Sequence, residues 1–221
     1  MSSPLLSHIQ TVLEDPRLSL HAGALSADKI GRISRFCLLL EKWNRKINLT
    51  GEKDAPGILE KHVFDSLQYL RWIGKQDRVL DIGSGGGFPG IPVKIIYPGI
   101  DLTLIESQRK RCSFLEEAVR TVELDRITVI NARAEQLGRD HQYSHYFDRV
   151  LFRGFSSIAQ CLDMGREFVN DTGRIILKKG PAESFPPEGP GGQDITCVQQ
   201  QVVEGFHGEE SRMMVFAPCS T

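Results

Sequence analysis

The sequence predicts an α/β fold in which a mostly parallel, seven-stranded sheet carries helices on both faces and follows an N-terminal helical extension. Two observations lead to this prediction. An apolar run ends at Asp81, breaks into a glycine-rich turn and resumes after Gly90, which indicates strand, turn and helix in succession. Beyond Gly90, strand and helix patterns alternate along the chain, as is typical of a parallel sheet.

The residues before the glycine-rich turn are predicted to be helical. A weak amphipathic stretch covers residues 5–13, and Ser26 precedes a longer one whose apolar side chains recur every three or four positions as far as Ile47. A third helix is expected over residues 58–72. We therefore interpret the chain as a single domain, with a helical extension at residues 1–74 and a Rossmann-like core at residues 75–221.

Five strands are predicted in the core, at residues 78–82, 101–106, 127–131, 147–152 and 173–178. Besides the short helix after the glycine-rich turn, helices are expected at residues 110–122 and 158–168. The segment 181–192 is rich in Pro and Gly and is expected to be a mobile loop. Residues 195–203 and 212–217 are expected to add a closing pair of strands at one edge of the sheet.

Composition narrows the class of protein. A chain of 221 residues with 40% apolar and 25% charged side chains is long enough for one sizeable core. The net charge of −1 gives no global indication of nucleic-acid binding, although basic residues slightly outnumber acidic ones before residue 75. The five cysteines form no C-x-x-C pattern and suit buried thiols in a reducing compartment. Because the sequence has neither a signal-peptide pattern nor an apolar run of membrane-spanning length, we expect a cytoplasmic protein that does not bind membranes. We also expect it to be a monomer.

The glycine-rich turn is the first candidate binding site, because glycine lets a ligand approach the backbone closely. Gly85, Gly87 and Gly90 also match the G-x-G-x-x-G pattern of dinucleotide sites. The charge of Asp81 would oppose a pyrophosphate but suit a ligand that carries an ammonium and a sulfonium. The order of strand, acid and glycines from Asp81 to Gly85 resembles the first motif of class I S-adenosylmethionine-dependent methyltransferases. That resemblance implies S-adenosylmethionine as the cofactor.

Three further positions follow predicted strands at the same sheet edge. Glu106 ends the second strand, where an acid either accepts hydrogen bonds from ribose hydroxyls or only faces solvent. Ala134 and Glu135 follow the third strand, where this fold holds an adenine. Arg153 and Phe155 follow the fourth strand, at the edge that holds the reaction centre, and they suit a nucleobase or a phosphate.

The residues after the fourth strand also exclude two reactions. Neither the Asn-Pro-Pro-aromatic arrangement of amino-methyltransferases nor a Pro-Cys nucleophile for a pyrimidine carbon follows that strand. A purine N7 already has a lone pair and needs no deprotonation, so positioning supplies most of its catalysis.

Longer motifs extend the resemblance to one family. They are Asn48-Leu49-Thr50, His62-Val63-Phe64-Asp65-Ser66-Leu67, Phe88-Pro89-Gly90-Ile91-Pro92, Lys110-Arg111-Cys112-Ser113-Phe114-Leu115, Arg133-Ala134-Glu135 and Lys179-Gly180-Pro181. In this order, between residues 36 and 181, they resemble the RsmG (GidB) family, whose members methylate N7 of a guanine in bacterial 16S ribosomal RNA with S-adenosylmethionine. The resemblance implies that 16S rRNA or the small ribosomal subunit is the partner. It also implies cofactor contacts at Gly83, Phe88, Ala134, Glu135 and Arg153, with Glu106 at the ribose.

The chain departs from the family pattern at two of these places. The family more often has Asp at the position of Glu106, and usually Ser-Arg-Ala-Phe where this chain has Phe152-Arg153-Gly154-Phe155. Another methyltransferase substrate is one alternative function. A nucleotide-binding oxidoreductase or regulatory module is the other.

The remaining candidates are charged or titratable side chains. Arg109, Lys110 and Arg111 begin a helix, where cations are unfavourable for the helix dipole, so RNA phosphate is a candidate partner and a solvated face is the alternative. Lys179 is the fourth RNA-binding candidate. His62 and Asp65, one helical turn apart, either position the substrate together with Arg153 or only pack the helix onto the sheet. His141 and His145 have metal-ligand spacing without further partners, so no metal is predicted.

Overall fold

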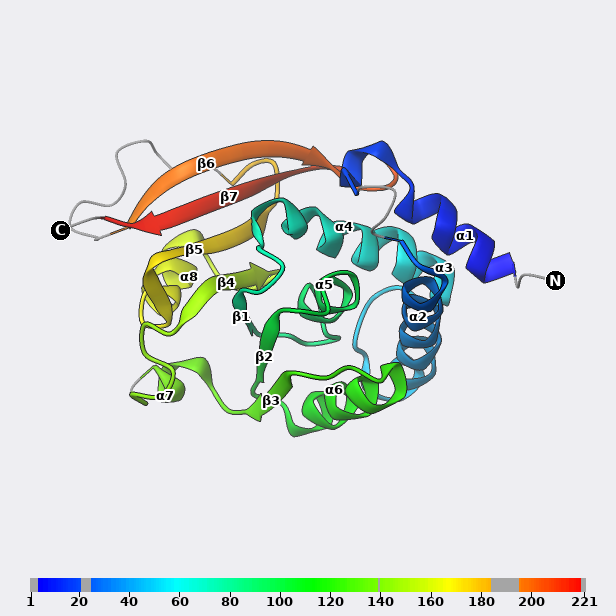
Figure 1. Ribbon diagram of the computed structural model, residues 1–221, viewed down its shortest axis with the longest axis horizontal. Coiled ribbons are helices and arrows are strands. Elements are labelled where there is room, and N and C mark those ends of the chain that lie inside the picture. The colour runs from blue at the N-terminus through cyan, green and yellow to red at the C-terminus, as the bar shows by residue number, and fades with distance from the viewer. Residues whose placement is uncertain (1–3, 21–24, 139, 184–194, 220–221) are drawn as a thin grey trace.

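The computed structural model describes residues 4–20, 25–138, 140–183 and 195–219. Within them, seven strands form one sheet in the order β3-β2-β1-β4-β5-β7-β6 (Figure 1). The strands are β1 (Arg78–Ile82), β2 (Asp101–Glu106), β3 (Ile127–Asn131), β4 (Phe147–Arg153), β5 (Val169–Lys179), β6 (Ile195–Glu204) and β7 (Glu210–Pro218). The first five are parallel, and β7 runs antiparallel to β5 and β6. The predicted α/β fold and its closing pair of strands are confirmed.

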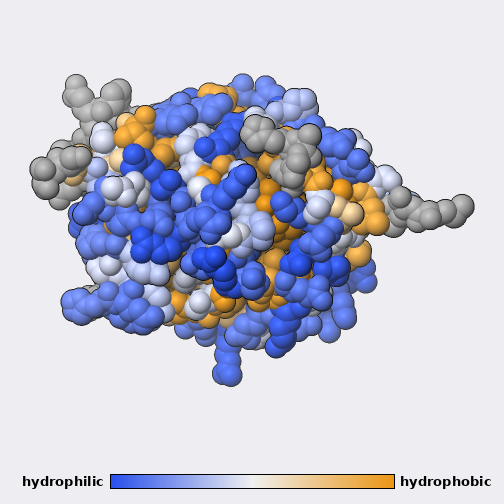
Figure 2. Space-filling model, viewed as in Figure 1, coloured by the Kyte–Doolittle hydropathy of each residue, from blue (hydrophilic) through white to orange (hydrophobic). Residues whose placement is uncertain are grey.

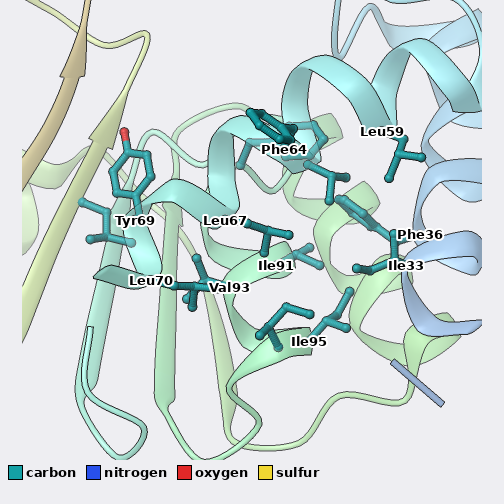
Figure 3. Packing of buried hydrophobic residues seen from close by; sticks show 14 of the residues in the cluster. Ile33, Phe36, Leu59, Phe64, Leu67, Tyr69, Leu70, Ile91, Val93 and Ile95 are labelled. Atoms are coloured by element: carbon teal, nitrogen blue, oxygen red, sulfur yellow. The ribbon is translucent and has the colours of Figure 1, made fainter. Parts of the chain in front are cut away.

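Helices cover both faces of this sheet. They are α1 (Pro4–Leu13), α2 (Ala27–Ile47), α5 (Gly90–Ile96), α6 (Arg109–Val122), α7 (Ala134–Leu137) and α8 (Ile158–Gly165), with a short 3-10 turn at Pro16–Leu18. Successive strand residues face opposite ways, so Val79 of β1 joins a buried cluster with the N-terminal helices while Leu80 joins one with α7 and α8. Figure 3 shows the first cluster, in which Ile33 and Phe36 of α2 lie toward Ile91 of α5. The N-terminal helices therefore share a core with the sheet.

The third N-terminal helix differs from its prediction. It begins earlier than residue 58, because the Asp54 side chain accepts a hydrogen bond from the Gly57 backbone N–H and Pro56 fits the first turn. It also changes its hydrogen-bonding pattern along its length, through α3 (Ala55–Gly57), a π-helix at Ile58–Val63, α4 (Phe64–Leu67) and a 3-10 helix at Gln68–Trp72. π-helical turns are frequent at functional sites. This one carries His62.

The fifth strand is longer than predicted. It begins at Val169, which pairs with Phe147, and the preceding helix ends at Gly165 instead of Phe168. Gly165 packs tightly on the strand, because a Cβ at that position would lie 2.9 Å from Cδ1 of Ile175. Most of the expected loop 181–192 lies outside the described residues.

The surface in Figure 2 is mainly hydrophilic, with smaller hydrophobic patches between the charged side chains. Within the described residues, no helix is both long enough and apolar enough to cross a membrane. Cys37, Cys112 and Cys161 are buried free thiols, whereas Cys197 is partly exposed and Cys219 is exposed.

Candidate functional site

Asp81 lies at the end of β1, fully buried beneath the glycine-rich turn. Its Oδ2 accepts a hydrogen bond of 2.9 Å from the Gly90 backbone N–H. Its Oδ1 is buried and has no hydrogen-bond partner among the described residues. Burial raises the pKa of Asp81 to about 7, although the bond from Gly90 opposes this shift. A buried carboxylate with one unused oxygen fits a cationic ligand group.

Two positions of the glycine-rich turn require glycine. Gly83 and Gly85 have φ angles of 74° and 52°, which favour glycine. A Cβ on Gly83 would lie 2.7 Å from Cδ2 of Phe155, so the phenylalanine ring packs directly against this glycine. The turn is thus shaped to bring backbone and an aromatic ring close together.

Glu106 lies at the end of β2 and is 4% exposed. Its Oε2 accepts from the Gly85 backbone N–H at 3.0 Å, and its Oε1 accepts from the Gln108 backbone N–H at 2.8 Å. The Arg111 guanidinium lies 3.8 Å away. Glu106 therefore ties the glycine-rich turn to the start of α6. A carboxylate has about four acceptor sites, so these bonds leave capacity for ribose hydroxyls.

Two pockets open at this edge of the sheet. The first, of about 420 Å³, is lined by Gly83, Gly85, Phe88 and Arg153 together with residues from the N-terminal extension. The second, of about 490 Å³, is lined by Ala134, Glu135 and Phe155. Six of the predicted cofactor residues thus divide between two neighbouring pockets, whereas Asp81 and Glu106 are buried behind the glycine-rich turn and line neither of them. Phe155, which packs on Gly83, lies where the two pockets approach each other.

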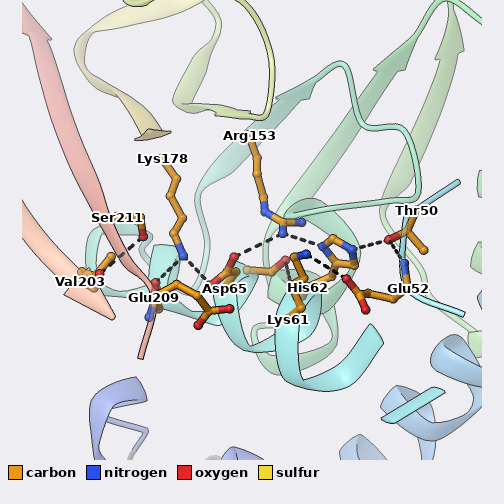
Figure 4. A network of polar contacts seen from close by, with 12 residues as sticks. Thr50, Glu52, Lys61, His62, Asp65, Arg153, Lys178, Val203, Glu209 and Ser211 are labelled. Carbon is orange, nitrogen blue, oxygen red and sulfur yellow. Dashed lines mark hydrogen bonds and ion pairs between the residues drawn. The ribbon is translucent and has the colours of Figure 1, made fainter. Parts of the chain in front are cut away.

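A polar network forms one wall of the first pocket (Figure 4). Nη2 of Arg153 lies 2.6 Å from Nδ1 of His62 and 3.3 Å from Oδ2 of Asp65. Nζ of Lys178 donates to the other oxygen of Asp65, and to Oε1 of Gln68 at 2.9 Å. His62 and Asp65, which the sequence offered as pocket residues or packing residues, both line the pocket.

His62 is neutral in this network. Burial, reinforced by the charges of Arg153 and Lys61, lowers the pKa of His62 to about 3. Because Arg153 can only donate, Nδ1 of His62 accepts, and the proton of the neutral ring is on Nε2. Nε2 then donates to the Thr50 hydroxyl.

Sequence reasoning missed Lys178 and Gln68. Lys178 is 9% exposed and Gln68 is 1% exposed, so both are buried polar side chains. One signal was present for the lysine: two cations end the apolar run of β5 at the same sheet edge as Arg153. Gln68 carried no such signal.

The four RNA-binding candidates lie in different environments. Arg109 and Lys110 are exposed at the start of α6, and Arg111 is partly buried against Glu106. Lys179 lines the first pocket, and its Nζ donates to the Ser156 carbonyl. Only part of this set is therefore at the pocket itself.

No group of three or more His, Cys, Asp or Glu side chains with the geometry of a metal site occurs in the part of the chain that the structure describes. His145, one of the two histidines with metal-ligand spacing, contacts the Val169 carbonyl through Nδ1 at 3.1 Å.

The strand order and the glycine-lined pocket are typical of class I methyltransferases. Two solved structures share the fold: M. jannaschii TYW2 in complex with AdoMet (TM-score 0.54, 17% identity, covering 71% of this chain and 74% of that one) and P. horikoshii TYW2 in complex with MeSAdo (TM-score 0.53, 16% identity, covering 70% and 61%). The family model for GidB, rRNA small subunit methyltransferase G, matches residues 29–190. The chain belongs to this family.

Curated relatives agree with this assignment. Ribosomal RNA small subunit methyltransferase G of Roseiflexus castenholzii is 38% identical over 72% of this chain and 68% of the relative. The protein of the same name from a Geobacter species is 39% identical over 75% of each chain. The protein is therefore a methyltransferase, and its cofactor is S-adenosylmethionine. Oδ1 of Asp81, which has no hydrogen-bond partner in the described part of the chain, lies beneath the glycine-rich turn and suits a positively charged cofactor.

Proposed function

We propose that this protein methylates N7 of a specific guanine in bacterial 16S ribosomal RNA, within the small ribosomal subunit or its RNA. It would do so in the cytoplasm, as a monomer in which the N-terminal helices and the sheet form one domain. The observation that carries the proposal is the pocket in which the glycine-rich turn over Asp81 meets Arg153 in a chain of this family.

The chain offers contacts for the ammonium group, the ribose and the adenine of the cofactor. Asp81 suits the ammonium group, because one of its oxygens is buried and unpartnered among the described residues. Gly83, Gly85 and Phe88 supply a close-fitting wall, and Glu106 lies beside them with acceptor capacity for the ribose. Ala134 and Glu135 line the adjoining pocket, which suits the adenine.

Methylation of N7 requires no general acid or general base from the protein. When bound, S-adenosylmethionine supplies an electrophilic methyl group, which the N7 lone pair takes while the electron pair of the S–C bond returns to sulfur. No proton has to be removed, so holding the base in line is the main task of the side chains. Arg153, fixed by His62 and Asp65, is well suited to hold it.

Two helices add cations beside the pocket. Helices α2 and α6 pack antiparallel, because Arg32 near the start of α2 donates to the Glu123 carbonyl after the end of α6, at 2.6 Å. At their other ends, the rings of Trp43 and Phe114 lie 5.8 Å apart. The last turns of α2 therefore lie beside the first turns of α6.

This packing gathers exposed cations from both helices. Lys42 and Lys46 near the end of α2 join Arg109 and Lys110 at the start of α6. The cluster lies next to the glycine-rich turn, since a Cβ on Gly85 would be 4.0 Å from Arg111. Such a cluster suits the phosphate backbone of RNA, which dominates the affinity of nucleic-acid binding. We call Lys42, Lys46, Arg109 and Lys110 the basic cluster.

The test is chemical cleavage at 7-methylguanosine in 16S RNA from cells with and without the gene. We expect one cleavage site to disappear without the gene and to return when purified protein and S-adenosylmethionine are added to the RNA or the small subunit. Identical cleavage patterns would overturn the assignment to N7 of guanine in 16S RNA.

A further inference from the structure

We infer that Arg153 and Lys178 recognise O6 of the target guanine and thereby determine which purine is methylated. The inference rests on the proposed function and adds to it the means of base selection. The supporting observation is that Arg153 and Lys178, in the wall of the first pocket, both donate hydrogen bonds to Asp65.

The chemistry of the purine edge sets the problem. Guanine presents two acceptors side by side, N7 and O6, whereas adenine presents the acceptor N7 beside the N6 amine, a donor. Methylation requires N7 to face the methyl group, so N7 is not available for a protein donor. The neighbouring position is then the place on this edge where the two purines differ, and it needs a donor to favour guanine.

The strong acceptors of this pocket are already engaged. Oδ1 of Asp65 receives Lys178 and Oδ2 receives Arg153 at 3.3 Å. Nδ1 of His62 receives the same guanidinium at 2.6 Å, and the low pKa of His62 keeps the ring neutral. The wall formed by this network therefore presents positively charged donors to a ligand, because the Asp65 carboxylate is already occupied by Arg153 and Lys178.

Donors remain on both cations. The contacts of Arg153 with His62 and Asp65 both come from Nη2, so in the described part of the chain the N–H groups on Nη1 and Nε are left for a ligand. Lys178 uses two of its three N–H groups, on Asp65 and Gln68. The side chains of Arg153 and Lys178 are 16% and 7% exposed, so a base that enters the pocket displaces most of the remaining water.

This arrangement favours O6 and disfavours N6. A carbonyl oxygen would accept from the fixed cations without any rearrangement of the network. An exocyclic amine would place its own N–H groups against theirs, and donors on both sides would lose their hydrogen bonds. Sites built to bond one substrate group reject an analogue that lacks it far more strongly than apolar pockets do.

The experiment replaces the target guanosine, once it is mapped by 7-methylguanosine cleavage, with single analogues in ligated 16S RNA. Inosine keeps N7 and O6 but lacks the 2-amino group, 2-aminopurine keeps N7 but lacks O6, and 7-deazaguanine lacks the methyl acceptor. With methyl-labelled cofactor, we expect inosine to react within about tenfold of guanosine and 2-aminopurine to react at least about 100-fold more slowly. Equal rates for guanosine and 2-aminopurine would overturn the inference. Guanosine that is not methylated, or label in the 7-deazaguanine RNA, would instead overturn the proposed function.

Variants assign the effect to residues. Lys178→Met should lower kcat/KM for guanosine RNA by about tenfold or more, since a charge-assisted hydrogen bond to O6 is lost. For the same reason it should decrease the ratio of kcat/KM for guanosine RNA to kcat/KM for 2-aminopurine RNA. Lys178→Arg should restore part of that ratio. Arg126→Met removes an exposed cation before β3, paired with Asp101, and should leave the ratio unchanged. A Lys178→Met enzyme with a lower rate but an undiminished ratio would mean that the lysine only supports the pocket, and would remove it from base recognition.

Discussion

Nδ1 of His62 accepts a hydrogen bond from Nη2 of Arg153 across 2.6 Å, and Nε2 of the same ring bonds to the Thr50 hydroxyl. The imidazole therefore links the loop after α2 to the end of β4. Its ring also lies 4.9 Å from the ring of Phe88, which fixes its plane. A neutral histidine can serve in this way, whereas an imidazolium could not accept from a guanidinium.

The first prediction is that His62→Gln makes folding less sensitive to acid. The pKa of His62 is about 3 in the folded protein against an ordinary 6.5, so the unfolded chain binds a proton that the folded protein does not. The stability that the neutral ring provides is complete above pH 6.5 and is lost as the pH falls toward 3. The loss amounts to about 1.4 kcal/mol per pH unit, and glutamine, which keeps an acceptor, does not titrate.

Urea unfolding at pH 7.5, 6 and 5 measures this difference. We expect the free energy of unfolding of the wild type to fall more steeply than that of His62→Gln, by about 2 kcal/mol at pH 5. The exposed His141 provides a matched control, because His141→Gln should keep the wild-type slope. Parallel curves for the wild type and His62→Gln would show that the ring at position 62 is accessible to protons.

The second prediction concerns Arg153→Ala. The side chain lies at the pocket with 16% exposure, so its removal should leave the fold intact while methyl transfer drops by about 100-fold or more. Arg153→Lys keeps the charge but not the planar fork, and should recover only part of the activity. Circular dichroism and single-turnover methylation of 16S RNA measure the two effects. Full activity in Arg153→Ala would remove this residue from the site.

The third prediction is that Asp81→Asn stabilises the protein and weakens cofactor binding. Burial raises the pKa of Asp81 from 3.8 to about 7, so ionisation destabilises the folded protein as the pH rises through this range. Asparagine retains an acceptor for the Gly90 N–H without the charge. At pH 8 we expect a gain of about 1–3 kcal/mol in unfolding free energy.

Cofactor affinity should change in the opposite direction. Without the carboxylate, the ammonium of S-adenosylmethionine loses its partner, so its Kd should rise at least about tenfold. In the wild type, affinity should increase as the pH rises through 7, because the ionised acid is the form that binds a cation. Calorimetry at pH 6, 7 and 8 tests both statements, and an unchanged Kd in Asp81→Asn would contradict them.

The parts of the fold and the site that depend on local pattern were predictable, and those that depend on packing between distant segments were not. The alternation after Gly90 is enough to predict β2, α6 and β3, because each element has its own apolar period. Lys178 and Gln68 are 110 positions apart in the chain and meet only when β5 packs beside the 3-10 helix Gln68–Trp72. No spacing in the sequence encodes that contact, and their polar character alone suggested exposure.

The fourth prediction is that alanine destabilises the protein at Gly83 and stabilises it at Gly31. In Gly83→Ala the new Cβ would meet Phe155 at 2.7 Å with φ at +74°, so we expect a loss of about 1–2 kcal/mol and of cofactor binding. In Gly31→Ala, inside α2, the nearest atom would be 3.9 Å away, and the helix should gain about 1 kcal/mol. Thermal unfolding with and without S-adenosylmethionine checks both. A Gly83→Ala protein that the cofactor still stabilises would show that the ring of Phe155 moves aside.

The last prediction concerns the basic cluster. Lys46→Gln and Lys110→Gln each remove one exposed cation from the adjoining ends of α2 and α6, so each should weaken RNA binding at low salt. The slope of log K against log salt concentration should decrease in magnitude by about 0.7–0.9 per lost phosphate contact, while the Kd for S-adenosylmethionine stays the same. Arg120→Gln, at the far end of α6, removes an exposed cation that is paired with Glu117 and should leave the slope unchanged. If all three variants change the slope equally, RNA binding depends on the overall charge of the protein, and the basic cluster is not a specific RNA-binding site.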